Sequence, residues 1–155
     1  MGALYHHFPD KAALAAAVYA EVMGEYQHGF LEMLREQQTA EGGIRGGVIH
    51  HLRWVAANRG EALLLLAERL DSEALRACNR EFYAAIRKWW RPHHTYGVLK
   101  AMEPGVTAAL WLGPAQEYTR YWIASDAETM SDTVIETFAT AEWQVVRAEP
   151  GARPR

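Results

Sequence analysis

The stretch KAALAAAVYAEVMGEYQHGFLEMLREQ, residues 11–37, decides the fold class of this chain. Its large apolar residues recur at every fourth position and so lie along one side of a helix: Leu14, Val18, Val22, Tyr26, Phe30 and Leu34. Asp10 stands directly before the stretch and can accept the free amide hydrogens of the first turn. At about 1.5 Å per residue the helix would be roughly 40 Å long, so we expect it to be the central strut of the domain.

The rest of the chain has the same helical periodicity between sparse prolines and glycines. After a loop over 39–43, we expect helices over 44–59, 61–70, 72–97, 104–124 and within 126–147. Gly60 should provide a left-handed cap and Gly97 should end its helix, whereas Pro92 and Pro114 should bend the helices that they interrupt. Pro104 stands at a helix start, where its missing amide hydrogen costs nothing. We therefore predict an all-α protein.

The composition indicates a single folded domain. The chain has 155 residues, of which 50% are hydrophobic and 23% are charged, and it contains 6 tryptophans. Its formal charge of −3 gives no general attraction to nucleic-acid phosphates. The single Cys78 forbids an internal disulfide, no stretch is apolar enough to span a membrane, and the first residues lack a secretory signal. We expect a cytoplasmic protein with no membrane partner.

The opening residues GALYHHFPDKAAL, 2–14, closely resemble the end of the DNA-reading helix and the start of the next helix in the tetracycline-repressor (TetR) family. The match rests on residue types at fixed mutual spacings: Leu4, Tyr5, a histidine, Phe8, Lys11 and Leu14. The helix lengths that follow are similar to the family's ligand-binding and dimerisation region. The resemblance implies a TetR-like helical bundle over 10–147, preceded by a remnant of the helix-turn-helix DNA-binding domain over 1–9 and followed by a loose tail over 148–155.

The chain departs from the family at its start, because members place two further helices before this segment. A helix-turn-helix needs its first helix to brace the recognition helix, and a remnant of about six residues cannot hold itself folded. The resemblance implies DNA-contact positions at Tyr5, His6 and Lys11, but we expect this truncated chain not to bind DNA specifically. Operator DNA would be a partner only where the missing helices are present. The alternative is that these three side chains are simply solvated.

A second predicted site is a mostly apolar pocket between the middle helices, the usual form of a small-molecule site between packed helices. Its candidate residues combine rings and aliphatic side chains with a few polar groups: Tyr26, Phe30, His51, Trp54, Leu66, Phe82, Ile86, Trp89, His93, Trp111 and Gln116. Each could instead be an ordinary core residue. With the resemblance, the set predicts a small hydrophobic or aromatic, weakly polar effector and no cofactor.

A third predicted site is a dimer interface on the last two long helices. In TetR relatives this helix pair packs against its two-fold mate, which requires a self-complementary apolar patch with a polar rim. The residues assigned to a homodimer interface are Leu112, Thr119, Arg120, Trp122, Ile135, Phe138, Ala139, Glu142, Trp143 and Val146, with Gln116 shared with the pocket. The alternative is that they close the chain's own core.

We find no sequence motif for a metal site or for catalysis. Adjacent histidines point about 100° apart on a helix, and Glu25-x-x-His28 has no second copy with which to build a di-iron site. The glycine-rich run 42–47 lacks the Lys-Ser/Thr that completes a phosphate loop, and no G-x-S-x-G elbow occurs. Cys78 lies on an apolar stripe, which is typical of an inert core thiol.

The sequence is compatible with three functions. The first is the effector-binding and dimerisation part of a TetR-like regulator, in which ligand binding tilts the helix over 11–37 and releases operator DNA. The second is a helical-bundle enzyme acting on a small hydrophobic molecule, with His51, His93 or Glu25 as acid or base. The third is a dimerising antagonist that pairs with a full-length regulator and silences it. We favour the first function and predict that the protein is not an enzyme.

Overall fold

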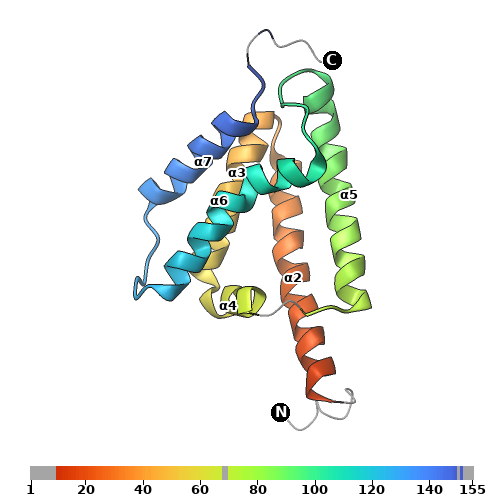
Figure 1. Cartoon of the computed structure of the whole chain (residues 1–155), viewed down its shortest axis with the longest axis vertical. Coiled ribbons are helices and arrows are strands. Elements are labelled where there is room, and N and C mark those ends of the chain that lie inside the picture. Colours follow the sequence, from red (N-terminus) through yellow and green to blue (C-terminus); the bar gives the residue numbers. More distant parts are fainter. Residues whose placement is uncertain (1–9, 68–69, 150, 152–155) are drawn as a thin grey trace.

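The computed structural model describes residues 10–67, 70–149 and 151. These residues form helices and no strand, which confirms the all-α prediction. The helices, labelled as in Figure 1, are α2 (Lys11–Glu36), α3 (Ala40–Ala57), α4 (Arg59–Ala67), α5 (Glu73–Thr95), α6 (Pro104–Ala124) and α7 (Asp132–Val146). None of the described helices is both long and apolar enough to cross a membrane.

The helix starts follow the capping residues in the sequence. Asp10 and Ser72 accept the amide hydrogens of Ala13 at 2.7 Å and Leu75 at 3.1 Å, and both predicted caps are confirmed. Gly97 ends α5 with a φ of 70°, as predicted, because a left-handed residue lets the next amides turn back onto the last carbonyls. The N–H groups of Gly97 and Val98 each bond a carbonyl of the last turn at 2.9 Å.

Two sequence predictions at the ends of α3 are wrong. The expected loop over 39–43 is largely helix, because Thr39 accepts the amide hydrogen of Gly42 and so starts α3 early. Gly60 is not a left-handed cap but lies inside α4. No such cap is needed there, because both the backbone amide and the side-chain amide of Asn58 bond the carbonyl of Trp54.

The central helix of the domain is α3 rather than α2. It packs against α2, α4, α6 and α7, and in Figure 1 it lies between α2 and α7. Its side chains Ile44, Val48 and Leu52 are fully buried in the main core. The long α2 runs along one side of α3, packs lengthwise on α5, and its first turns project beyond the other helices (Figure 1).

The glycine-rich run at the start of α3 allows two tryptophans to approach its backbone. A Cβ atom at Gly43 would lie 2.6 Å from Cη2 of Trp89, and one at Gly47 would lie 2.8 Å from Cζ2 of Trp111. Both distances are far below ordinary contact between carbon atoms, about 3.5–4.0 Å. These glycines therefore make the room in which the indole rings of α5 and α6 pack, a role that their phosphate-loop-like spacing did not suggest.

Backbone and side-chain hydrogen bonds tie the ends of several helices together. The guanidinium of Arg59, at the start of α4, bonds the carbonyls of Ile123, Ser125 and Ala127 at 2.7 Å each and lies 4.5 Å from the centre of the Trp122 ring. At the opposite end of α6, the segment 98–100 pairs with the end of α7. There the amide of Ala148 bonds the carbonyl of Val98 at 2.9 Å, so the first residue of the predicted tail is held by the domain.

Candidate functional site

A half-open groove of about 530 Å³ lies between the second half of α5 and the first half of α6. The α5 wall is formed by Phe82, Tyr83, Ala84, Ile86, Arg87, Lys88, Trp90, Arg91 and His94. The facing wall is apolar apart from one threonine and is formed by Met102, Pro104, Thr107, Ala108, Trp111 and Leu112. The volume is within the range of small-molecule sites, about 300–1,000 Å³.

The floor of the groove is aromatic and touches α2. The rings of Phe82 and Trp111, both in the groove lining, have centroids 5.5 and 5.6 Å from that of Phe30 on α2. Trp111 is oriented by a 3.0 Å hydrogen bond from its indole nitrogen to the carbonyl of Ile44, and Trp90 lies 5.6 Å from it, centroid to centroid. A ligand in the groove would therefore press on rings that contact the longest helix directly.

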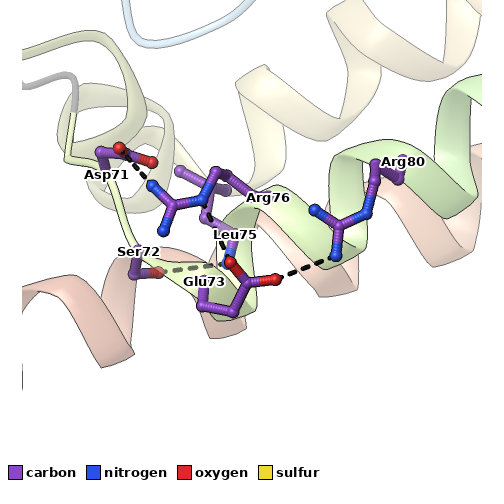
Figure 2. A network of polar contacts seen from close by, with 6 residues as sticks. All are labelled: Asp71, Ser72, Glu73, Leu75, Arg76 and Arg80. Carbon is purple, nitrogen blue, oxygen red and sulfur yellow. Dashed lines mark hydrogen bonds and ion pairs between the residues drawn. The ribbon is translucent and has the colours of Figure 1, made fainter.

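The cations of α5 divide into a paired set and an unpaired set. At the start of the helix, Arg76 and Arg80 bond the carboxylate of Glu73, and Arg76 also bonds Asp71 at 2.6 Å (Figure 2). Hydrogen bonds from these two arginines hold the pKa of Glu73 below its ordinary value. Further along, Arg87, Lys88 and Arg91 line the groove and form no ion pair with any residue that the structure describes.

The predicted pocket residues are only partly brought together by the groove. Phe82, Ile86 and Trp111 line it. Trp89 and His93 lie next to them, with ring centroids 4.6 Å apart, but Trp89 packs toward Gly43 of α3 instead of into the groove. The other six lie elsewhere. Leu66 is half-buried on α4, Gln116 is exposed on α6, and a packed cluster inside the bundle contains Tyr26, Phe30, His51 and Trp54.

Sequence reasoning missed the residues that give the groove its charge, and a signal for them was present. The run Arg87-Lys-Trp-Trp-Arg91 places three cations and two indoles within five residues, and no acidic residue follows until Glu103. The apolar stripe of α5 marks only the core-facing side of the helix, and Tyr83, Arg87, Trp90 and Arg91 lie outside that stripe.

His51 sits in a buried hydrogen-bond chain that fixes its protonation. The hydroxyl of Thr119 donates to the carbonyl of Ala115 at 3.0 Å, so Nε2 of His51 must donate to Thr119 Oγ1 at 3.1 Å. Nδ1 then accepts from the hydroxyl of Tyr26 at 2.9 Å. Burial lowers the pKa of His51 to about 4, and burial raises the pKa of Tyr26 above its ordinary value. With both ring nitrogens engaged in the core, His51 is held neutral and does not line the groove.

Glu142 is a buried carboxyl group rather than an interface residue. Its side chain is 1% exposed, and its Oε1 accepts the backbone amide hydrogen of Ala115 at 3.0 Å. This amide follows Pro114, whose ring disturbs the regular bonding of α6. Burial raises the pKa of Glu142 to about 8, and its Oε2 has no hydrogen-bond partner among the described residues.

The structure corrects most of the predicted interface assignments. Six of the residues are buried against the chain's own helices and offer no surface to a partner: Thr119, Trp122, Ile135, Ala139, Glu142 and Val146. This is the alternative in which they close the core. Leu112 lines the groove, Arg120 is exposed beside Glu117, and Phe138 and Trp143 are half-buried.

A different face of α6 and α7 carries exposed apolar side chains. On α7, the outer stripe is spaced three and four residues apart and is half-buried or exposed: Val134, Phe138, Ala141 and Val145. On α6, Val106, Leu110 and Tyr121 are 44%, 36% and 70% exposed. Tyr118 links the two helices, with its ring 5.0 Å from that of Phe138 and 5.9 Å from that of Tyr121. We refer to these two stripes together as the outer face.

The remaining predicted positions concern DNA and metals. Tyr5 and His6 lie outside the described residues, and Lys11 is exposed at the first position of α2. Within the described part of the chain, no three histidine, cysteine or acidic side chains come together in a way that could hold a metal ion. His28 forms a 3.3 Å contact with Glu32 on the exposed side of α2, so the Glu25-x-x-His28 spacing does not point inward.

Comparisons with known proteins identify the fold. No family model matches the sequence, and no curated protein matches it. The chain is similar to the crystal structure of a TetR family transcription regulator from Marinobacter aquaeolei VT8, with a TM-score of 0.79 and 15% identity over 96% of this chain and 78% of that one. It is also similar to a candidate TetR family transcription regulator from Shewanella sp. PV-4, with a TM-score of 0.73 and 16% identity over 96% of this chain and 81% of that one. The chain thus has the fold of TetR family regulators, as the resemblance of its opening residues implied.

Proposed function

We propose that this chain is the effector-binding and dimerisation part of a TetR-like transcription regulator that acts in the cytoplasm. Small-molecule binding in the groove between α5 and α6 releases operator DNA from the complete regulator. The fold likeness to two transcription regulators over 96% of the chain supports this class of function. The groove supports the small-molecule input, because its size and aromatic floor suit a ligand rather than a catalytic centre.

The contact between the groove floor and α2 is the observation that carries the proposal. Phe82 from one wall and Trp111 from the other both meet the ring of Phe30 on α2. Gln27, one turn earlier on α2, is buried and donates a 2.7 Å hydrogen bond to Asn79 of α5. A ligand that separates α5 from α6 therefore changes the packing of α2 in its second half.

The proposed output is a change in the direction of α2. The resemblance places DNA-reading helices immediately before this helix, and its first turns already project beyond the rest of the bundle (Figure 1). In a dimer, two reading heads must lie one DNA turn apart, about 34 Å. A small tilt at Phe30 is amplified along the 26-residue helix and moves the heads out of register.

The outer face of α6 and α7 is the proposed dimer interface. Its two apolar stripes lie on adjacent helices, and a two-fold axis between them would bury the same residues on both subunits. Sedimentation should give a dimer at micromolar protein concentration. The double variant Tyr121→Lys with Val145→Lys should sediment as a monomer. The control Ala74→Lys changes an exposed residue on the first turn of α5 and should remain a dimer. A parent protein that stays monomeric would remove this part of the proposal.

The ligand part of the proposal is tested with a neutral aromatic probe. N-phenyl-1-naphthylamine should gain fluorescence on binding to the parent protein. Ala108→Trp, which fills the groove, should abolish the gain, and Ala109→Trp, on the neighbouring exposed position outside the lining, should keep it. Equal binding by both variants would place the probe elsewhere and refute the groove as the effector site.

A further inference from the structure

We infer that the groove selects aromatic molecules that carry an anionic group, such as an aryl carboxylate or sulfonate. The inference rests on the proposed ligand site and specifies the chemical class that enters it. It replaces the weakly polar effector expected from the apolar residues of the sequence. The evidence is the charge on one wall, the aromatic floor beside it, and the absence of any acidic lining residue in the described chain.

The cations of the α5 wall are not neutralised by acidic side chains of the described residues. Arg87, Lys88 and Arg91 line the groove without an acidic partner among the described residues. On the same helix, Arg76 and Arg80 are paired with Glu73 (Figure 2), so within α5 the arginines outside the groove have an acidic partner and those that line it have none in the described chain. Like charges on neighbouring turns repel one another, and an anion between them would relieve that repulsion.

The helix dipole does not account for these cations. A positive side chain near a helix C-terminus is favourable, but the effect falls off within the last turn. The helix ends at Thr95, and its last turn holds His93 and His94 as its basic residues. Arg87 and Lys88 lie two turns earlier, so the dipole does not explain their position.

The geometry suits a flat molecule with its charge at one edge. Arg87 and Arg91 are four residues apart and therefore lie on one side of α5, one turn from each other. Two guanidinium groups in this arrangement can bind the oxygens of a carboxylate or sulfonate with several charge-assisted hydrogen bonds. Trp90 lies between them in sequence and contacts the floor residue Trp111, so an aromatic body could stack there while its charge meets the arginines.

A small molecule fits this site better than a macromolecule does. Arg87, Lys88 and Arg91 are exposed to solvent, but they line one half-open groove of about 530 Å³ opposite the apolar wall of α6, so their charge is concentrated at one recess. The chain as a whole is acidic, with a formal charge of −3, and offers no wider field to a polyanion. Charge complementarity is therefore local and suits one anionic group.

The test compares two probes that share one ring system. 8-Anilinonaphthalene-1-sulfonate carries a sulfonate, and N-phenyl-1-naphthylamine is the same skeleton without it. We expect the anionic probe to bind the parent protein at least tenfold more tightly, with an affinity that falls as salt is added. Ala108→Trp should abolish its binding, which assigns the probe to the groove.

A pair of double variants on α5 isolates the cations of the groove. Arg87→Gln with Arg91→Gln should weaken the anionic probe by about tenfold and leave the neutral probe within about twofold. Arg76→Gln with Arg80→Gln removes the same charge from the same helix outside the groove and should change neither probe. Circular dichroism on each variant verifies that the fold is retained.

The outcomes separate the inference from the proposed function. If both probes bind in the groove with equal affinity, the groove remains a ligand site and the selection of anions is refuted. If the two double variants weaken the anionic probe equally, general electrostatics replaces the groove arginines as its cause and the inference is also refuted. If neither probe binds the folded parent protein, both the inference and the ligand site are overturned.

Discussion

The substitution Gly43→Ala should destabilise the protein although it places a better helix former inside α3. A Cβ atom at this position would lie 2.6 and 2.9 Å from Cη2 and Cε2 of the Trp89 ring and also overlap Cζ2. Carbon atoms in contact need about 3.5–4.0 Å. The ring is rigid, so the whole indole or the helix backbone must move by an ångström or more.

The expected loss is the difference of two opposing terms. Replacing glycine by alanine within a helix gains about 1 kcal/mol, whereas an overpacked core costs about 1–3 kcal/mol. The cost should be near the upper limit, because Trp89 also stacks on Trp111 with centroids 6.0 Å apart and contacts the tilted ring of His93 at 4.6 Å. We expect a net loss of about 1–2 kcal/mol in the free energy of unfolding.

Urea denaturation followed by far-UV circular dichroism, at one protein concentration, measures this loss. Gly60→Ala is the matched control, because nothing lies within 4 Å of its Cβ position in α4, and it should be neutral or stabilising. In a background of Trp89→Phe, which removes the outer ring, the penalty of Gly43→Ala should shrink. A Gly43→Ala variant at least as stable as the parent would refute the close-packing argument.

Three further substitutions test the buried polar groups and the Arg59 contacts. Thr119→Val should cost about 1–3 kcal/mol, because it leaves Nε2–H of His51 without an acceptor in the core; a loss below about 0.5 kcal/mol would contradict the hydrogen-bond chain. Burial raises the pKa of Glu142 from its ordinary 4.5 to about 8, so the parent protein loses stability as the pH rises through that range. Glu142→Gln does not titrate, and by pH 8 its free energy of unfolding should have increased relative to that of the parent by on the order of 1–3 kcal/mol. Urea midpoints measured from acid to alkaline pH give that difference, and a constant difference would show that the carboxyl does not titrate in this way. Arg59→Gln should lower the free energy of unfolding by about 2 kcal/mol in the same denaturation assay, because three carbonyls bonded at 2.7 Å lose their donor. The control Arg53→Gln removes one exposed ion pair of 3.5 Å and should change the free energy of unfolding by less than about 0.5 kcal/mol. Equal effects of the two arginine substitutions would refute the capping role.

Local features of the chain could be predicted from the sequence because they depend only on neighbouring residues. Asp10 and Ser72 cap helices through hydrogen bonds that span three residues. Gly97 ends α5 through its own left-handed backbone conformation, which does not depend on residues distant in the sequence. The stripe along 11–37 likewise follows from the helical period alone. These features determined the helix order and the all-α class.

The assignment of apolar faces depended on which helices meet. On α7 two apolar stripes were visible in the sequence, and periodicity could not tell which one faces the core. Packing against α3 and α6 buries Ile135, Ala139 and Val146 and leaves Val134 and Val145 toward solvent. Most of the α7 residues predicted for the interface therefore lie on the core-facing stripe, and the outer stripe is the one left for the proposed partner.

The sequence by itself determined the helices and their ends, because capping, turn and periodicity signals act over a few residues. Only the tertiary structure decided that Trp89 turns toward Gly43 while Arg87 and Arg91 line a groove with α6. That choice depends on the distance and rotation between α5, α3 and α6, which are set by the volumes of side chains far apart in the sequence. The charge of the groove and its link to α2 follow from this packing.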